Sequence, residues 1–393
     1  MRIPRVPTVT IEGLAFIVML GFVLAGSLVR QINLLLALFA LMAGLPLMNA
    51  LLVRATLRRL HVSRRIPRNV NAGDLLMAEL DLENRRRRLP SWAVTIEDEI
   101  RRQDASADDE PIAAKALCAF VPARATVKQS YRGRLMRRGR YQFGPLKLTT
   151  RFPFGLMRSS VTIDQPQTLL VFPRLGRLTR RWQRLQQHSD LGTNNVERRQ
   201  GLIEGDFYGL REWRRGDSRR WIHWRTSARR TTPVVRQFEQ QRNQDLALIV
   251  ELWRPARPTA AQVNNVELAI SFAASIVSDV CRRGGRTLWI AIAAREPRFN
   301  TGPTSLALTR EVMESLAVAE GTSSDTLPDA LSTTLSQVRA GTNAIVISTR
   351  PVDWTDTERF ARLWSNPRER AWMGRLQRID ISQAGLSDYF VPL

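Results

Sequence analysis

The sequence predicts a mixed α/β protein in three parts: an N-terminal transmembrane helical hairpin, an antiparallel β-sandwich-like region and a C-terminal Rossmann-like α/β domain. Three observations support this prediction. Two apolar runs of about twenty residues stand side by side at the start of the chain. Short alternating runs separated by turn residues follow them. In the last third, apolar strand-like runs alternate with helical patterns.

Residues 1–59 are expected to form the membrane hairpin, with spans at about 11–29 and 34–53. Each span is long enough to cross ~30 Å of hydrocarbon as a helix. Arg30–Asn33 leave room only for a tight turn, so the spans should run antiparallel. A signal peptide is one alternative, but a second span follows at once without a small-residue cleavage site between them. A buried helical hairpin in a soluble domain is the other.

Arginines flank the two spans unevenly, and this asymmetry predicts the orientation. The turn carries one arginine, whereas both outer flanks are basic: Arg30 in the turn, Arg2 and Arg5 before the first span, and Arg54, Arg58, Arg59, Arg64, Arg65 and Arg68 after the second. Positively charged flanks stay in the cytoplasm. We therefore expect a two-span protein of the inner (cytoplasmic) membrane, with the lipid bilayer as a partner and both termini cytoplasmic.

Residues 60–175 alternate apolar and polar residues in short runs, as is typical of an antiparallel β-sandwich. The expected strands include Leu75–Leu82, Ala93–Ile100, Ala125–Tyr131, Leu146–Thr150 and Thr168–Phe172. Arg85–Arg88 fall between Asn84 and Pro90, where a hairpin tip is expected. We interpret these arginines as a solvated turn rather than a headgroup or nucleic-acid contact, because single charge runs usually are solvated.

Residues 176–240 are expected to be a linker that contains a distinctive segment at 201–230. This segment mixes aromatic residues of the buried type with fixed charges. We expect guanidinium groups to stack on indole rings and to pair with Glu212 and Asp217. The candidate interaction residues are Arg211, Glu212, Gly216, Asp217, Arg220, Ile222, His223, Trp224, Ala228 and Arg229.

The order of motifs in this segment resembles the domain of unknown function 58 family. The residues that carry the resemblance are Arg211-Glu212-Trp213, Gly216-Asp217, Arg220-Trp221-Ile222-His223-Trp224, Ser227-Ala228-Arg229 and Arg236-Gln237-Phe238-Glu239, with Arg137–Tyr141, Gly144-Pro145 and Phe152–Leu156 upstream. The resemblance implies a membrane-tethered partner of a MoxR-type AAA+ ATPase that carries a von Willebrand factor A-like domain. It implies no established reaction.

Residues 241–393 alternate strands with helices, which predicts a parallel sheet covered on both faces. Strands are expected at 245–252, 286–294, 343–349 and 376–381, and helices at 263–283, 304–319, 328–339 and 356–364. This pattern agrees with the von Willebrand A-like domain that the resemblance implies. Such domains often bind a divalent cation through Asp-x-Ser-x-Ser after the first strand. Here Glu251–Pro255 lacks both serines, and Trp253 and Arg254 would crowd a cation, so we expect no metal and no cofactor.

Composition narrows the function classes further. The chain has a net charge of +23 and only three lysines (Lys115, Lys128, Lys147), so its charge favours anionic neighbours. Its two cysteines, Cys118 and Cys281, form neither a CxxC pair nor a metal-ligand spacing. No lysine follows a glycine, which excludes a Walker A loop, and no GxSxG, HExxH or GxGxxG motif occurs.

Our leading hypothesis is therefore a non-enzymatic assembly or regulatory partner. A hydrolase that uses Asp217 and His223 as acid and base is one alternative. Nucleic-acid binding by the Arg/Trp-rich segment is another. Acidic residues interleave that segment and its aromatic residues are spaced as if for burial, so we expect no nucleic-acid partner. If the segment is structural, Trp224→Ala should cost about 3–5 kcal/mol as a core truncation.

Overall fold

The computed structural model describes residues 7–31, 33–103, 110–192, 206–214, 217–230, 232–239, 245–339, 342–382 and 384–392. They belong to two compact units. The N-terminal unit comprises Met1–Arg174 with Leu316–Val318, and the C-terminal unit comprises Leu175–Ser315 with Ala319–Leu393.

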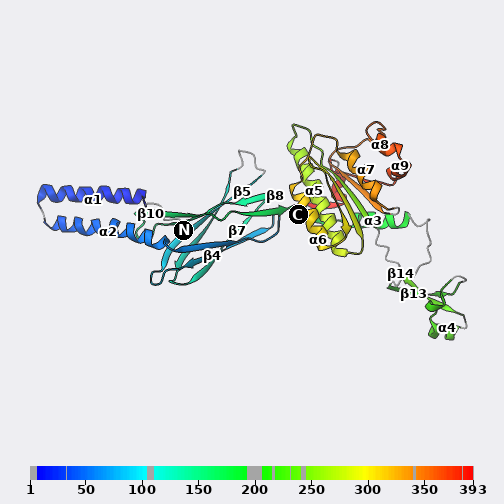
Figure 1. The fold of residues 1–393 in the computed structure, drawn as a ribbon, viewed down its shortest axis with the longest axis horizontal. Helices are drawn as coiled ribbons and strands as arrows, with labels where there is room; N and C mark the ends of the chain where they lie inside the picture. Colours follow the sequence, from blue (N-terminus) through cyan, green and yellow to red (C-terminus); the bar gives the residue numbers. More distant parts are fainter. Residues whose placement is uncertain are drawn as a thin grey trace. The chain divides into compact units, whose positions relative to one another are not determined.

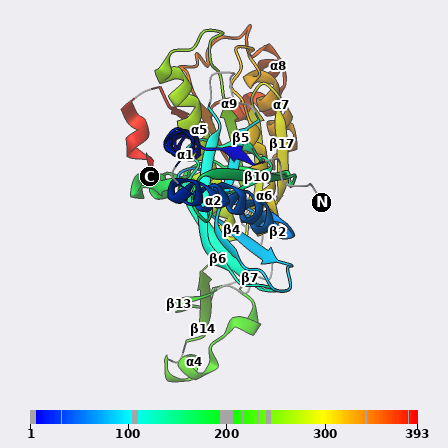
Figure 2. The ribbon, with the colours of Figure 1, turned by 90° about the vertical axis from the view of Figure 1, so that its left-hand side faces the viewer.

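Two apolar helices open the N-terminal unit: α1 (Ile11–Arg30) and α2 (Asn33–Leu57). They lie side by side and antiparallel, and Figure 2 shows them nearly end-on. Both are long and apolar enough to span a membrane, and only 11% of each span is buried within the protein. Helix α5 (Ala260–Arg283) also has that length and composition, but 56% of it is buried in the C-terminal unit. The expected hairpin is thus present, and α5 is a core helix.

Among the residues that the structure describes, eleven strands belong to the rest of the N-terminal unit. They are β1 (Thr8–Val9), β2 (Leu60–Arg65), β3 (Val70–Asn71), β4 (Leu75–Asn84), β5 (Ser91–Arg102), β6 (Ile112–Val121), β7 (Thr126–Arg134), β8 (Gly139–Phe143), β9 (Leu146–Thr150), β10 (Met157–Ile163) and β11 (Gln167–Phe172). The larger sheet has the order β1-β10-β9-β5-β8-β11-β3, with β6 also paired to β5. The smaller sheet has the order β2-β4-β7. All pairs are antiparallel except β11 with β3.

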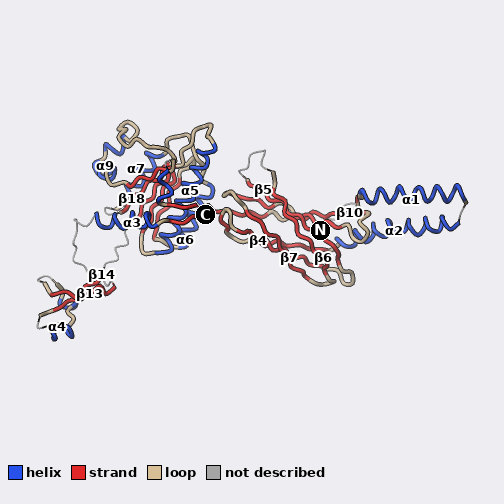
Figure 3. Tube along the Cα trace, turned by 180° about the vertical axis from the view of Figure 1, so that it is seen from behind, coloured by secondary structure: helices blue, strands red, loops and turns tan. Residues whose placement is uncertain are grey.

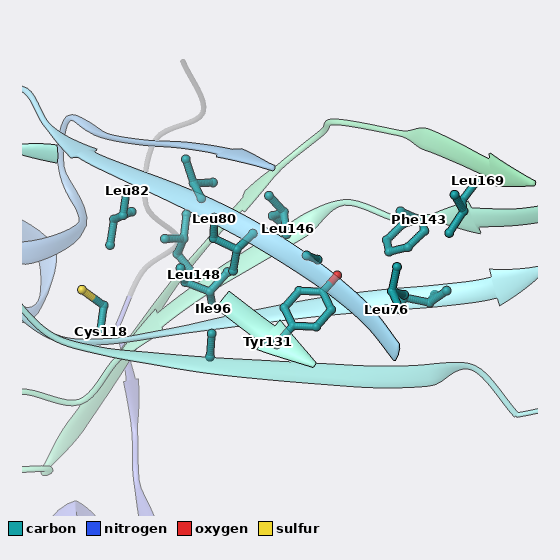
Figure 4. Close-up of a cluster of buried hydrophobic side chains, with 14 of the residues drawn as sticks. Leu76, Leu80, Leu82, Ile96, Cys118, Tyr131, Phe143, Leu146, Leu148 and Leu169 are labelled. Carbon is teal, nitrogen blue, oxygen red and sulfur yellow. The ribbon is translucent and has the colours of Figure 1, made fainter. Parts of the chain in front are cut away.

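One core joins the two sheets. Figure 4 shows the apolar side chains of β4 facing those of the larger sheet, among them Leu80 and Leu148, both at most 1% exposed. All five predicted strands overlap observed ones. Strands β6 and β8 were not predicted. In β6, the large apolar residues Ile112, Leu117 and Phe120 are exposed, so the apolar residues do not mark one buried face.

The sandwich also buries an ion pair. Arg64 on β2 and Asp98 on β5 are joined at 2.6 Å, and both side chains are at most 1% exposed. The Tyr131 hydroxyl donates to the other Asp98 oxygen, and Arg64 also donates to the Gln165 carbonyl at 2.6 Å. Burial, followed by the bond to Asp98, raises the pKa of Tyr131. Because all partners are satisfied, the pair is tolerated in the core.

The solvated-turn interpretation of Arg85–Arg88 is wrong for Arg86. That side chain is only 7% exposed, and its guanidinium donates to backbone carbonyls, including Ala55 in the last turn of α2. Arg85, Arg87 and Arg88 are exposed, as expected.

The C-terminal unit is built on a five-stranded sheet in the order β17-β16-β15-β18-β19. Its strands are β15 (Leu246–Glu251), β16 (Thr287–Ala293), β17 (Arg298–Pro303), β18 (Asn343–Ser348) and β19 (Gln377–Asp380). All pairs are parallel except β16 with β17. The antiparallel edge strand β17 was not predicted. Its sequence, RFNTGP, has no apolar alternation, because an edge strand needs little burial.

Helices cover both faces of this sheet (Figures 1 and 3). The helices are α5, α6 (Leu306–Val318), α7 (Leu327–Gln337), α8 (Ala361–Ser365) and α9 (Pro367–Met373). Helices α7, α8 and α9 share one apolar cluster with β15, β16 and β18. The helix predicted at 356–364 begins only at Ala361. Asp353 and Asp356 instead accept hydrogen bonds from nearby backbone amides, which favours turns over a helix.

The start of the expected linker belongs to the C-terminal unit. Strand β12 (Gly176–Leu178) pairs with β20 (Phe390–Pro392), and α3 (Arg180–Gly192) follows it. Trp182, which is fully buried, packs edge-on against Phe272 of α5 at 5.4 Å. The remaining strands, β13 (Asp206–Glu212) and β14 (Val234–Glu239), enclose η1 (Arg219–Trp221) and α4 (Trp224–Arg230). We call residues 206–239 the signature module.

Candidate functional site

The signature module is a β-hairpin with a long insertion. Strands β13 and β14 pair antiparallel, with Arg211 opposite Val235 and Glu212 opposite Val234. Ile222, in the insertion, makes an antiparallel bridge to Val235. Val234 and Val235 are each 1% exposed. The hairpin and its insertion thus meet at two buried valines.

Asp217 organises the first half of the insertion. Its carboxylate accepts two hydrogen bonds from Arg211, at 2.6 and 2.7 Å, and one from the backbone amide of Arg214 at 2.8 Å. The indole of Trp213 donates to the Asp217 carbonyl at 3.3 Å. The hydrogen bonds from Arg211 hold the pKa of Asp217 below its ordinary value. The predicted pairing of arginine with Asp217 is therefore present, and it is local.

His223 organises the second half. Its Nδ1 lies 2.8 Å from the Thr226 hydroxyl, and its backbone amide donates to the Val234 carbonyl at 2.8 Å. Ser227 donates to the His223 carbonyl at 3.0 Å and accepts from the Val234 amide at 2.9 Å. No hydrogen bond or ion pair joins His223 to Asp217 among the residues that the structure describes. Each is held by other partners, so the geometry gives the hydrolase hypothesis no support.

The expected burial of Trp224 is wrong. Its side chain is 70% exposed, at the first residue of α4. The predicted core-truncation cost for Trp224→Ala is therefore withdrawn. Glu212, Arg220, Ala228 and Arg229 are also exposed, whereas Ile222 and His223 are half-buried. Gly216 lies outside the described residues.

The surface of the module is strongly basic. Residues 206–239 contain nine arginines and four acidic residues, and one of those four, Asp217, is already paired with Arg211. The arginines exposed in the structure are Arg214, Arg219, Arg220, Arg225, Arg229, Arg230 and Arg236. An exposed tryptophan among arginines is the composition of a binding hot spot.

A second cluster lies in the C-terminal unit, at the carboxyl ends of β15 and β18. The strand order of the five-stranded sheet reverses between these two strands. Ligands of open α/β sheets bind at this place. Glu251 ends β15 and is 1% exposed. Its carboxylate accepts from Arg350 at 2.7 Å, from Ser348 at the end of β18, and from Arg359 at 3.4 Å.

Asp325 is the second carboxylate of this cluster and is more exposed than Glu251. It pairs with Arg350 at 2.8 Å and with Arg359 at 2.6 Å. Burial acts to raise the pKa of Asp325, but hydrogen bonds and charge from Arg359 and Arg350 outweigh it and lower that pKa. The Arg350 guanidinium also lies 4.6 Å from the centre of the Trp253 ring. Two carboxylates are thus bridged by two guanidinium groups.

Sequence reasoning reached Glu251 and Trp253 but missed Arg350, Arg359 and Asp325. The sequence carried one local signal of this cluster: Glu251 and Ser348 are polar residues that end apolar runs. A cavity of about 280 Å³ adjoins the cluster and is lined by Ser348, Arg350, Trp354, Arg378 and Asp380. Arg254 points elsewhere, donating to the Gly321 carbonyl at 3.1 Å.

Solved structures resemble only small parts of this chain. Northeast Structural Genomics Consortium target SoR45 matches 29% of this chain and 88% of its own, with 10% identity and a TM-score of 0.21. A β-glucosidase from Listeria innocua matches 28% of this chain and 16% of its own, with 14% identity and a TM-score of 0.20. Likenesses this weak carry no argument about fold or function.

Two sequence comparisons bear on the family. The uncharacterized protein YeaD of Bacillus subtilis (strain 168) is 26% identical over 248 residues, which are 63% of this chain and 58% of that protein. This chain thus spans less than two thirds of that relative's length. The matching family has no known function either: residues 209–365, from the signature module to helix α8, match the model of the family described as "Protein of unknown function DUF58".

Proposed function

We propose that this chain is a membrane-anchored, non-enzymatic assembly or regulatory protein whose signature module docks a partner protein. One observation carries the proposal: Trp224 is 70% exposed among exposed arginines, while Asp217 and His223 are held in internal hydrogen bonds. A surface of this kind is suited to binding, since its groups with acid–base chemistry are already engaged.

The proposed partner is a MoxR-type AAA+ ATPase. The family resemblance supports this choice, and the surface supports a partner with an acidic face. Arginines around an exposed indole attract carboxylates over distance and bind them through paired hydrogen bonds at contact. The indole then supplies the desolvated centre of the interface.

We also propose an inner-membrane location with both termini in the cytoplasm. Helices α1 and α2 have the necessary length and hydropathy, and arginines gather at the ends away from the turn. A periplasmic reporter fused after Leu393 should stay inactive, and a cytoplasmic reporter at the same place should be active. The opposite pair of results would overturn the orientation.

The C-terminal domain is proposed to be von Willebrand A-like but without the metal of such domains. Its support is a sheet that is parallel except at one edge, with helices on both faces. Where the cation would lie, Arg350 and Arg359 already neutralise Glu251 and Asp325. A third positive charge there would be repelled.

Affinity purification from solubilised membranes tests the partner. The wild-type chain should recover an AAA+ ATPase, and Trp224→Ala and Arg225→Glu should each lose most of it. Leu306→Ala is the matched control, because Leu306 is also an exposed apolar residue (87%) but lies outside the module. Failure of the wild-type chain to recover any AAA+ protein would refute the partner. Equal recovery by Trp224→Ala would refute the surface.

The exposure of Trp224 also favours one competing function, the binding of single-stranded nucleic acid. Bases stack on exposed aromatic rings while arginines contact phosphates. A fluorescence titration with single-stranded DNA or RNA separates the two functions. Nucleic-acid affinity should fall steeply with salt and fall again in Trp224→Ala if this second function holds. No binding at low salt would remove it.

A further inference from the structure

The membrane hairpin is fixed to one edge of the β-sandwich. Thr10, which caps α1, donates through its hydroxyl to the Gly155 carbonyl at 2.7 Å and through its amide to the Leu156 carbonyl at 3.1 Å. Gly13 in the first turn lies so close that an added Cβ would stand 2.0 Å from the Leu156 oxygen. The loop that joins β9 to β10 is therefore held against the start of α1.

This contact sets the depth of the loop. Helix α1 has 20 residues and a length of about 30 Å, which equals the thickness of the hydrocarbon layer. If α1 spans the membrane, as proposed above, its first turn lies at the lipid–water boundary. The β9–β10 loop then lies at the level of the phospholipid headgroups.

A cavity of about 330 Å³ opens beside that loop, on the outer face of the larger sheet. Thr95, Thr149, Arg151, Phe152 and Arg158 are among the residues that line it. The Thr149 side chain is only 6% exposed, yet its hydroxyl has no hydrogen-bond partner. A buried hydroxyl without a partner costs free energy, so a hydrogen bond from this atom to a group in the cavity would be favourable.

Positive charge dominates the cavity. No hydrogen bond or ion pair joins the guanidinium groups of Arg151 and Arg158 to another residue within the described part of the chain. The acidic residue of the lining, Glu97, is already paired with Lys147 at 3.3 Å and with Lys115 at 3.6 Å. Glu12, in the first turn of α1, also acts electrostatically on Arg151. The charged residues of the lining are thus two arginines and one glutamate, and that glutamate already pairs with two lysines.

Phe152 lines the same cavity, and its aromatic neighbours form a border beside it. Trp92 lies 4.4 Å from Phe120 and 5.6 Å from Phe152, between ring centres. Trp92 and Phe120 are each 42% exposed, and Phe154 is 45% exposed. Exposed aromatic rings beside a transmembrane helix are typical of the headgroup region, where one side of the ring is apolar and the other is hydrated.

From these observations we propose that the cavity binds the phosphate group of an anionic phospholipid of the surrounding leaflet. Arg151 and Arg158 supply the charge for the phosphate oxygens, and the Thr149 hydroxyl donates to one of them. The aromatic border contacts the glycerol and the upper acyl chain. The occupant is a lipid and not a free anion because the cavity opens at headgroup depth, a placement that rests on the proposed membrane insertion.

Thermal unfolding of the full-length chain in detergent tests this site. Added short-chain phosphatidylglycerol should raise the melting temperature, because a ligand that binds the folded state stabilises it. Short-chain phosphatidylcholine should raise it much less. Arg151→Gln and Arg158→Gln should each weaken the apparent phosphatidylglycerol affinity by about tenfold, the size expected for one charge-assisted hydrogen bond. Thr149→Val should weaken it while keeping the side-chain volume.

Arg87→Gln with Arg88→Gln is the matched control, because both arginines are exposed in the same unit and neither lines the cavity. Equal loss of affinity in this control would reduce the effect to general charge and overturn the site. An equal stabilisation by inorganic phosphate would overturn the lipid as occupant. Carbonate washing of membranes reports insertion separately. Extraction of the wild-type chain would refute the anchor. If every variant stays in the membrane and also keeps the wild-type affinity for phosphatidylglycerol, the cavity alone is refuted.

Discussion

The guanidinium of Arg86 donates to the carbonyl of Ala55, in the last turn of helix α2. It also donates to the Pro90 carbonyl at 2.8 Å and to Ser91, whose hydroxyl donates in turn to the Thr56 carbonyl at 2.9 Å. Helix C-termini carry unpaired carbonyls and a partial negative charge, so a cation is favourable there. Arg86 thus fastens the end of the hairpin to the β-sandwich.

Arg86→Met should lower the free energy of unfolding by about 3 kcal/mol, since it leaves several buried carbonyls without a donor. The measurement is chemical unfolding of the detergent-solubilised chain. Arg87→Met, which changes an exposed arginine, should stay within about 0.5 kcal/mol of the wild type. Equal effects of the two substitutions would contradict the fastening role.

Asp98→Ala should cost about 3–5 kcal/mol, because it leaves the buried charge of Arg64 without its carboxylate partner. Glu99→Ala provides the comparison. Glu99 pairs with Arg101 at the surface, where such pairs contribute about 0–1 kcal/mol. Urea denaturation of both variants measures the difference, and a cost for Asp98→Ala as small as that for Glu99→Ala would disprove it.

Arg350→Met should also destabilise the chain by about 3–5 kcal/mol, since the buried carboxylate of Glu251 would lose its nearer guanidinium and keep only the hydroxyl of Ser348 and the more distant guanidinium of Arg359. The double variant Arg350→Met with Glu251→Gln should recover part of that loss, because it removes the unpaired charge. Arg295→Met, in an exposed pair with Glu320, serves as the control. No recovery in the double variant would argue against charge pairing as the cause.

Magnesium should leave the melting temperature of the wild-type chain unchanged. A cation that bound the folded C-terminal domain would raise it in proportion to the logarithm of its concentration. Arg350 and Arg359 occupy the position between Glu251 and Asp325, so no such rise is expected. A saturable rise with Mg²⁺ or Mn²⁺, abolished by Glu251→Gln, would establish a metal site there.

The pH dependence of stability should reveal the Arg211–Asp217 pair. Hydrogen bonds from Arg211 lower the pKa of Asp217 in the folded chain, whereas the unfolded value is about 3.9. A depressed pKa gives stability that is present above the unfolded value and is lost as the pH falls through the folded value. The stability difference between wild type and Asp217→Asn should therefore be constant near neutral pH and shrink below about pH 4. A difference that is independent of pH down to strongly acidic conditions would contradict this assignment.

The sequence predicted those features that depend on local patterns. Two long apolar runs with a four-residue gap predicted the hairpin, and a short alternating run after a turn signal predicted β9 at the residues where it lies, Leu146–Thr150. Apolar runs alternating with helical patterns predicted the parallel sheet, because a strand buried on both faces has few polar residues. Each of these signals lies within one continuous stretch of chain.

Only the tertiary structure determined which individual charged and aromatic side chains are buried and which partners they have. Arg86 is buried while Arg85 and Arg87 are exposed, and Trp224 faces solvent although its neighbours resemble core residues. Arg350 reaches Glu251 across 99 residues of sequence. Local periodicity specifies which stretches become helices or strands, whereas the partner of a buried charge depends on which distant backbone atoms the fold brings within hydrogen-bond reach.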